Sequence, residues 1–111
     1  MNPKDILYFG HILDAIVRAI SSVSNISRKD FESMIDVQDA CIRRLEVIGE
    51  AVKNVSLETK KKHPEIRWKE IAGTRDRIIH SYFIVDLNVI WDICRNDLPV
   101  LEKQLKEVLK G

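Results

Sequence analysis

The stretch VQDACIRRLEVIGEAVKNV, residues 37–55, decides the class of fold. Its apolar side chains recur at steps of three and four residues, which draws one stripe along an α-helix: Val37, Cys41, Leu45, Ile48, Val52 and Val55. Ala40, Gly49 and Ala51 are small enough to let another helix approach closely. A long helix with one apolar face must pack against further secondary structure. We therefore predict an all-α protein built around this segment.

A second long helix is predicted upstream of this segment. From Ile6 to Val23 the apolar residues again alternate at steps of three and four, and Pro3 suits the first turn. Ser27, with Asp30 three residues later, resembles a capping box. We expect a new helix to begin there and to continue into the stripe of residues 37–55.

Shorter helices are expected downstream. Ser56 can cap a short helix that ends near His63, because the residue before Pro64 avoids the helical region. Residues 68–72 are expected to form one more turn, stopped by Gly73.

The last third of the chain completes the predicted bundle. Thr74 is placed to cap a helix that carries residues 75 to about 82, and Asp86 can cap the next helix. The sequence Asp-Leu-Pro at 97–99 either begins the last helix or kinks a continuous one. No strand alternation is evident. The predicted architecture is an antiparallel bundle of four or five helices in a single domain, residues 1–111.

Composition narrows the class of protein further. The chain has 111 residues, and 45% of them are hydrophobic and 32% charged, which fits a packed helical protein better than a disordered one. Its net charge is only +1, so any binding of nucleic acid must come from local charge. Cys41 and Cys94 stand far apart and are interpreted as buried thiols in a reducing cytoplasm. No apolar run approaches membrane-spanning length, and a signal-peptide core is lacking, so we expect a soluble, cytosolic protein with no membrane partner.

The sequence RDRIIHSY, residues 75–82, carries a fixed cation, an imidazole and a phenol within eight positions. Arginine offers a fork of donors to phosphate oxygens, and histidine can give or take a proton near neutral pH. On a straight helix Arg75 and His80 would point about 140° apart, whereas Arg75 and Tyr82 would share a face. Spacing alone therefore does not form a site. A long arginine side chain, a distorted turn or a second subunit could bring the groups together, but such residues are more often structural.

Local charge near this segment is positive. Seven cations face three carboxylates between residues 60 and 77: Lys60, Lys61, Lys62, Arg67, Lys69, Arg75 and Arg77, against Glu65, Glu70 and Asp76. This excess could guide a phosphate backbone toward the motif in a salt-dependent way. A solvated helix face is the alternative for the three consecutive lysines.

Other candidate residues have structural interpretations. His11 is expected to be an interior or interface histidine, and His63 to serve the turn before Pro64. Trp68 and Trp91 are expected to be core or dimer contacts rather than platforms for stacking bases. No set of histidines and carboxylates has the spacing of metal ligands, so the sequence predicts no metal and no cofactor.

Arg75, four residues, His80, one residue and Tyr82 together resemble the HEPN signature of HepT-type toxins. Four further segments look like that family in the same order: LEVIGEA at 45–51, HPEI at 63–66, WKEIAG at 68–73 and DLP at 97–99. One departure is Asp76, where many HEPN motifs carry Asn. Its charge would repel phosphate unless Arg75 or Arg77 neutralises it.

The resemblance implies a homodimer, possibly within a higher assembly, in which two motifs face a shared cleft that cuts RNA without a metal. Arg75 and His80 would be catalytic, and Asp76, Arg77 and Lys69 would support the site or contact RNA. Since each chain offers one motif histidine, the dimer would supply both a base and an acid, and which His80 plays which role is left open.

It further implies a toxin whose partner is a nucleotidyltransferase antitoxin of the MntA type. That enzyme would add AMP to Tyr82, and the added phosphate and base would block access of RNA. Two alternatives remain. One is a non-catalytic HEPN protein that binds nucleotide or presents substrate to a nucleotidyltransferase, and the other is a plain helical dimer.

Overall fold

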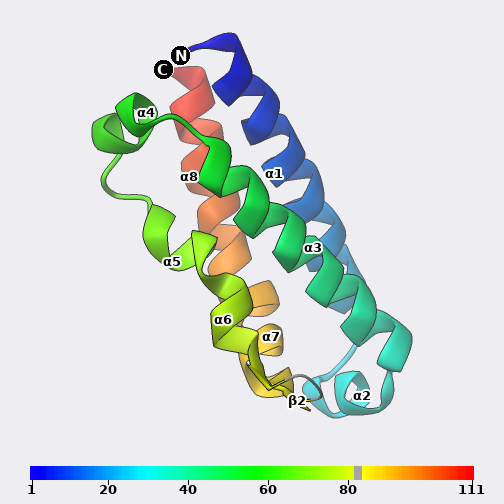
Figure 1. Cartoon of the computed structure of the whole chain (residues 1–111). Helices are drawn as coiled ribbons and strands as arrows, with labels where there is room; N and C mark the ends of the chain where they lie inside the picture. The colour runs from blue at the N-terminus through cyan, green and yellow to red at the C-terminus, as the bar shows by residue number, and fades with distance from the viewer. Residues whose placement is uncertain (82–83) are drawn as a thin grey trace.

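The computed structural model describes residues 1–81 and 84–111, and the side chains of all of these except residues 79–81. Three long helical segments run along the molecule (Figure 1): α1 (Pro3–Val23), α3 (Ile35–Asn54) and a last segment in which α7 (Leu87–Asp92), a π-helical turn η1 (Ile93–Asp97) and α8 (Leu98–Lys110) follow one another. The short helices α4 (Leu57–Lys62), α5 (Trp68–Ala72) and α6 (Thr74–Ile78) lie along one side, and α2 (Arg28–Ser33) closes one end. The predicted all-α bundle of the HEPN type is confirmed.

The core lies where α1, α3 and the last segment meet. The predicted stripe of α3 is buried at Cys41, Leu45, Ile48 and Val52, as is that of α1 at Phe9, Ile12 and Ile16. Both tryptophans belong to this core: the ring of Trp68 lies 6.1 Å from that of Phe9, and the ring of Trp91 lies 5.3 Å from that of Phe31. The expectation that they are core residues is confirmed, because they are only 8% and 9% exposed.

The predicted continuous helix from residue 28 to residue 55 is wrong at one point. The backbone leaves the helical region at Met34, with φ −102° and ψ 80°, which separates α2 from α3. The Gln38 side-chain amide donates hydrogen bonds to the carbonyl oxygens of Phe31 (2.8 Å) and Glu32 (3.2 Å). The bond to Glu32 satisfies a carbonyl that the break would leave without a helical partner, whereas the Phe31 carbonyl also accepts the Met34 N–H at 3.2 Å. The predicted capping box of Ser27 and Asp30 is present at the start of α2.

The predicted helix over residues 75–82 is also wrong. Helix α6 ends at Ile78, and strand β1 (Ile79–Ser81) then pairs antiparallel with β2 (Ile84–Val85), with Ile79 opposite Val85 and Ser81 opposite Ile84. The Asp86 N–H closes this hairpin on the Ile78 carbonyl at 2.7 Å. The β-branched residues Ile79, Ile84 and Val85 favour strands, and the hairpin satisfies their backbone groups locally. Asp86 then caps α7 through the Val89 N–H, as predicted.

The Asp97-Leu98-Pro99 sequence lies within a continuous helical segment. The Leu98 N–H donates to the Ile93 carbonyl five residues back, in the pattern of a π-helix, and α8 begins at Leu98. Pro99 has no N–H to give and stands in the first turn of α8. The π-helical turn therefore lets the chain accept a proline without a break.

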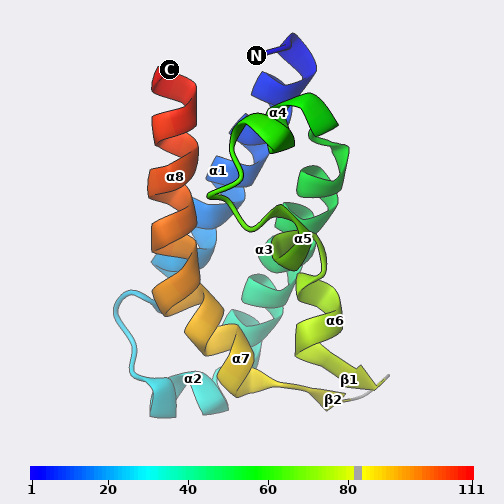
Figure 2. The ribbon, with the colours of Figure 1, turned by 90° about the vertical axis from the view of Figure 1, so that its left-hand side faces the viewer.

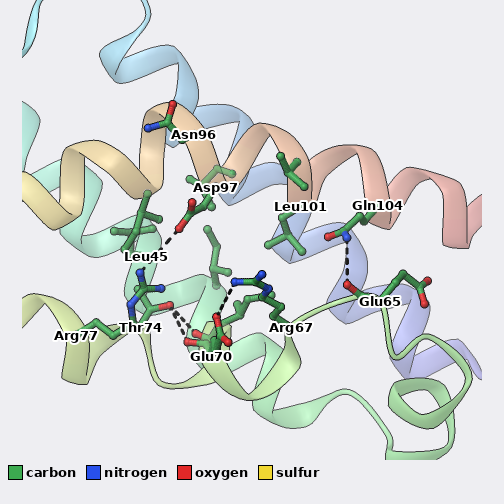
Figure 3. A pocket seen from close by; sticks show the side chains of 15 residues that line it. Leu45, Glu65, Arg67, Glu70, Thr74, Arg77, Asn96, Asp97, Leu101 and Gln104 are labelled. Atoms are coloured by element: carbon green, nitrogen blue, oxygen red, sulfur yellow. Dashed lines mark hydrogen bonds and ion pairs between the residues drawn. The ribbon is translucent and has the colours of Figure 1, made fainter.

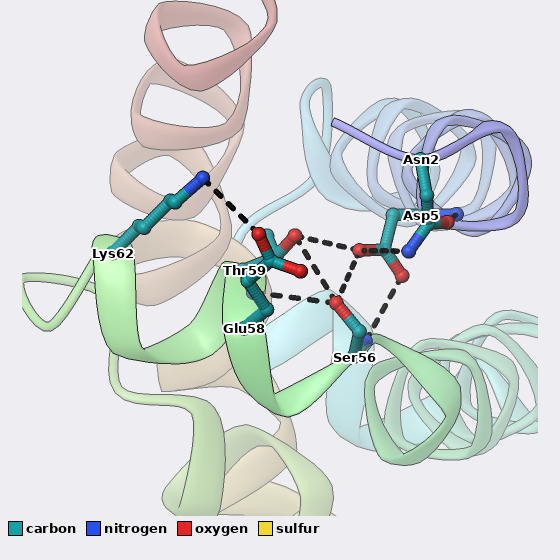
Figure 4. Close-up of polar contacts among 6 residues, drawn as sticks. All are labelled: Asn2, Asp5, Ser56, Glu58, Thr59 and Lys62. Carbon is teal, nitrogen blue, oxygen red and sulfur yellow. Dashed lines mark hydrogen bonds and ion pairs between the residues drawn. The ribbon is translucent and has the colours of Figure 1, made fainter.

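The carboxylate of Asp5 ties the start of α1 to α4 (Figure 4). It accepts hydrogen bonds from the Ser56 N–H (2.9 Å), the Ser56 hydroxyl (2.6 Å) and the Thr59 hydroxyl (2.6 Å). Burial alone would raise the pKa of this carboxyl, but the bonds from Ser56 and Thr59 outweigh burial and hold the pKa below its usual value. Ser56 also accepts the Thr59 N–H, so the predicted cap of α4 is confirmed.

The surface of α1 differs from the sequence-based expectation in two ways. His11 is exposed in the single chain, so of the two predicted roles, interior or interface histidine, the interior one is wrong and the interface one stays a prediction. We also expected no run of membrane-spanning length, yet the 21 residues of α1 have a window of mean hydropathy 1.4, enough to cross a membrane by length and composition. Part of this apolar character is explained by the face buried against α3 and α8, and a core helix passes the same test. Both chain termini lie at the end of the molecule opposite the hairpin (Figures 1 and 2).

Candidate active site

The motif begins on α6, directly after the end of α5, and the end of α5 lies close against α3. Gly49 allows this approach, because a Cβ there would lie 3.4 Å from the carbonyl oxygens of both Ile71 and Ala72. The Thr74 hydroxyl donates back to the Ile71 carbonyl at 2.7 Å. Thr74 therefore joins α6 to the end of α5 and does not cap α6 as predicted. The predicted close approach at Gly49 is confirmed, whereas Ala40 is exposed.

Arg75 and Asp76 are exposed on α6 and line a small cavity of about 160 Å³. Its opposite wall is α3, which contributes Glu46, Glu50 and Lys53. Three carboxylates thus face two cations around the proposed phosphate-binding arginine. Asp76 lines the same cavity as Arg75.

Arg77 lines a different cavity. Its guanidinium lies 3.9 Å from the Asp97 carboxylate, on the side of α6 that faces η1 and α8 (Figure 3). Residues two apart on a helix point in nearly opposite directions, which explains the separation. The structure therefore does not bring Arg77 into the cavity that Arg75 and Asp76 share. Lys69 is exposed on α5, directly before α6.

The three consecutive lysines do not accompany the motif. Lys60, Lys61 and Lys62 belong to α4, which lies near the chain termini, whereas α6 leads into the hairpin at the opposite end (Figures 1 and 2). Lys62 pairs with Glu58 of its own helix, with an Nζ–oxygen distance of 3.4 Å. The interpretation of these lysines as a solvated helix face fits this placement better than a role in guiding RNA to Arg75.

His80 is the middle residue of β1, so the helix ends between Arg75 and His80. The angle of about 140° expected on a straight helix does not apply across this junction. The side chain of His80 and the whole of Tyr82 lie outside the described residues. Arg75, Asp76, Arg77 and Lys69 are all placed within or next to the segment α5–α6.

Sequence reasoning missed the contribution of α3 to this cavity. Glu46, Glu50 and Lys53 recur at steps of four and three, so they share one face of α3 beside Gly49. That spacing could have predicted a charged strip next to the close approach at Gly49. The motif alone did not show which helix would lie beneath it.

The two thiols are buried, and His63 has a structural role. Cys41 and Cys94 are free and fully buried, as predicted. The neighbouring Cys41 thiol and burial raise the pKa of Cys94, so this thiol stays protonated and unreactive. His63 ends α4, and its carbonyl accepts the Trp68 indole N–H at 2.9 Å, which is the structural role predicted for it. Among the described residues, no group of three or more His, Cys, Asp or Glu is placed to hold a metal ion.

The chain is an all-α bundle of the HEPN type, with Arg75 exposed on a short helix and His80 on the strand that follows. A family model described as ribonuclease HepT-like matches residues 12–108. The chain therefore belongs to the HepT-like ribonuclease family, and the predicted enzyme class, ribonuclease, is that of its family.

Curated relatives support this assignment. The chain is 46% identical over 103 residues to a "putative RNase" of Caldanaerobacter subterraneus subsp. tengcongensis, covering 93% of this chain and 92% of the relative. It is 40% identical over 102 residues to a "probable ribonuclease HepT" of Thermococcus cleftensis, covering 88% and 93%. It is also 38% identical over 108 residues to a "gamma-glutamylcyclotransferase and putative RNase" of Methanocaldococcus jannaschii, covering 96% of this chain but 49% of that longer protein. No solved structure matches the chain.

Proposed function

We propose that this protein is a metal-independent RNA endonuclease that works as a homodimer, with Arg75 and His80 as its catalytic residues. The observation that carries the proposal is the exposure of Arg75 beside a cavity, on a helix that stops just before His80. A guanidinium in that position is free to meet a phosphate, and membership of the HepT-like family supplies the ribonuclease class.

The chemistry needs two proton-transfer groups. The 2′-hydroxyl oxygen attacks the adjacent phosphorus while a base removes its proton, and the 5′-oxygen leaves as an acid protonates it. The products are a 2′,3′-cyclic phosphate and a 5′-hydroxyl. Each chain offers one motif histidine, so His80 from each of two subunits would serve as base and acid.

Arg75 would stabilise the negative charge that develops on the phosphate oxygens. A preorganised donor of this kind commonly contributes about 3 to 4 kcal/mol to transition-state stabilisation. The carboxylates of Glu46 and Glu50 on α3 would orient the guanidinium rather than bind RNA, since they line the cavity beside it. Arg77 and Lys69 would act as outer contacts to the RNA, because both are exposed, Arg77 on α6 and Lys69 on the preceding helix α5.

We further propose that the nuclease is the toxin of a toxin–antitoxin pair and that an MntA-type nucleotidyltransferase modifies Tyr82. In that step the tyrosine oxygen would attack the α-phosphorus of ATP, and pyrophosphate would leave. The added AMP would bring a negative charge and a large base to the motif and so exclude RNA. This part of the proposal rests on the family and on the presence of Tyr82 two residues after His80.

The test is to express the wild type, His80→Ala and His11→Ala without any partner and to follow growth and total RNA. His11 is a matched control, because it is an exposed histidine on α1, away from the motif. We expect the wild type and His11→Ala to arrest growth and degrade RNA, and His80→Ala to do neither. Intact RNA in all three cultures would contradict the proposal and favour the non-catalytic partner of a nucleotidyltransferase.

A further inference from the structure

The larger cavity, which the proposed catalytic residues do not use, has the properties of a binding site. It measures about 570 Å³ and lies between α5–α6 on one side and η1–α8 on the other (Figure 3). Cavities that hold small ligands commonly have volumes of roughly 300 to 1,000 Å³. Aliphatic side chains line much of it: Leu45, Ile48, Ile71, Ile93, Leu98 and Leu101.

Two features set this cavity apart from an ordinary packing defect. Its wall includes the π-helical turn η1, and π-helical turns occur frequently at functional sites. Four segments outside the motif resemble the family, and each contributes at least one residue to the wall of this cavity: Leu45, Glu65, Glu70 and Asp97. Three of those residues are carboxylates, which packing alone does not require.

The polar rim is held by weak ion pairs. Arg67 lies 3.4 Å from Glu70, and Arg77 lies 3.9 Å from Asp97, and all four side chains are largely exposed. Exposed pairs at such distances contribute little, about 0 to 1 kcal/mol each. A ligand can therefore displace them at small cost.

The charges of the rim select the chemistry of the ligand. Each of the two guanidinium groups among the described lining residues lies beside a carboxylate, Arg67 beside Glu70 and Arg77 beside Asp97, so neither offers an unopposed positive charge to a phosphate. A neutral nucleobase suits the cavity, because carboxylates accept hydrogen bonds from its amino group and guanidinium planes stack on its ring. Asn96 and Gln104 add amides that can both donate and accept. Adenine, cytosine and guanine carry the exocyclic amino group that uracil lacks.

We propose that this cavity binds one amino-bearing nucleobase of the RNA, next to the phosphate held by Arg75, and so gives the enzyme a base preference. This inference rests on the proposed ribonuclease function. Arg75 and Arg77 lie on opposite sides of the five-residue helix α6, and a helix with its side chains is about 10 to 12 Å across. The phosphate at one side of α6 and the base at the other can therefore belong to the same or neighbouring nucleotides.

The first test measures cleavage of single-stranded oligonucleotides that differ only in the base beside the cut. We expect an oligonucleotide with uracil at the position that the cavity binds to be cleaved about fivefold or more slowly than one with adenine, cytosine or guanine there. Glu70→Gln and Asp97→Asn are expected to reduce this difference, because an amide cannot accept as two carboxylate oxygens do. Glu58→Gln is the matched control, since Glu58 is an exposed glutamate of α4, away from the cavity, and it should keep the wild-type preference.

The second test measures binding without cleavage. Adenosine, cytidine and guanosine should shift the NMR signals of the Asn96 and Gln104 side-chain amides, and uridine should shift them less. Val100→Trp, at an exposed position of the cavity wall, should abolish these shifts without disturbing the core.

The outcomes separate this inference from the proposed function. Cleavage that depends on His80 but shows no base preference, with no nucleoside shifts, would overturn the base site and leave the nuclease standing. Nucleoside shifts in a protein that does not cut RNA would overturn the nuclease and with it the link to an RNA substrate. Shifts caused only by an apolar peptide would make the cavity a protein-docking site and would also overturn the inference.

Discussion

Asp5 shows how a single buried charge can organise a helix junction. Its carboxylate is 1% exposed and joins α1 to α4 through Ser56 and Thr59. We expect Asp5→Ala to lower the free energy of unfolding by about 2 to 3 kcal/mol, because donors to a charged acceptor are left without a partner. Asp14→Ala, which removes an exposed carboxylate from the same helix, should change it by less than about 1 kcal/mol. Urea unfolding measures both, and equal losses would contradict the role given to Asp5.

The same carboxylate predicts a dependence of stability on pH. The pKa of Asp5 is lower in the folded chain than in the unfolded one, so its contribution is complete above the unfolded value of about 3.9. It is lost as the pH falls through the lower folded pKa, since both states are then protonated. The difference in unfolding free energy between wild type and Asp5→Asn should therefore be constant from pH 5 to 7 and shrink below about pH 4. A difference in unfolding free energy that grows as the pH falls would contradict the lowered pKa of Asp5 in the folded chain.

Arg75 provides the residue-scale test of the active site. Arg75→Lys keeps the positive charge but loses the planar fork that matches phosphate oxygens. Because Arg75 is exposed, the melting temperature should stay within about 2 °C, while kcat for RNA cleavage should fall roughly 10- to 100-fold. Kinetics and thermal melts on the same samples separate the two effects. Unchanged kcat would remove Arg75 from the catalytic residues.

Individual residues were predictable where their role is local. The caps at Ser27, Ser56 and Asp86 follow from hydrogen bonds within three residues, and the sequence contains everything needed to predict them. His11 was not predictable, because the apolar pattern of α1 does not show that a histidine within it turns toward solvent. The cavity shared by Arg75 and Glu50 depends on a contact between α3 and α6 that no local pattern contains.

At the scale of elements, Gly49 sets how closely the α5–α6 segment approaches α3. Gly49→Ala places its Cβ at the limit of ordinary contact, 3.4 Å from two carbonyl oxygens, so the stability should change by less than about 1 kcal/mol. Gly49→Leu needs more room than the contact allows and should displace α5 and α6, with a loss of about 1 to 3 kcal/mol and of RNA cleavage. Thermal melts and cleavage assays compare the two variants. Full activity of Gly49→Leu would show that the contact does not position Arg75.

Element boundaries were predicted well where stop signals are strong and poorly where tertiary contacts decide. The end of α4 before Pro64 and the stop of α5 at Gly73 agree with the sequence. The break at Met34 is accompanied by hydrogen bonds from Gln38 to carbonyls of α2, and no local sequence pattern predicts these bonds. The hairpin after Ile78 was not predicted, because the cap expected at Thr74 favoured a helix through the motif over the β-branched residues Ile79, Ile84 and Val85.

For the whole molecule, the proposed shared site predicts how mixed dimers behave. Light scattering should give twice the chain mass of 12.9 kDa. If one reaction uses His80 of both subunits, a dimer of one wild-type and one His80→Ala subunit should lose at least about 100-fold in cleavage rate. Two independent sites would instead leave about half of the wild-type rate, and that result would contradict a shared cleft. Co-expression with two affinity tags isolates the mixed dimer for the assay.

The bundle itself was predictable because the stripes of α1, α3 and α8 are long and regular. The second subunit was implied only by the resemblance, since a helical pattern does not reveal which exposed face meets another copy. The same limit applies to the larger cavity, whose walls come from segments between residues 45 and 104.

The position of the two chain ends has a practical consequence for protein engineering. Because both ends emerge at the pole farthest from the hairpin, tags, fluorescent reporters or an entire fused enzyme can be attached there at a distance from the hairpin that follows α6 (Figures 1 and 2). A natural counterpart is the Methanocaldococcus jannaschii relative, in which the matched region makes up 49% of a longer polypeptide with a second named activity.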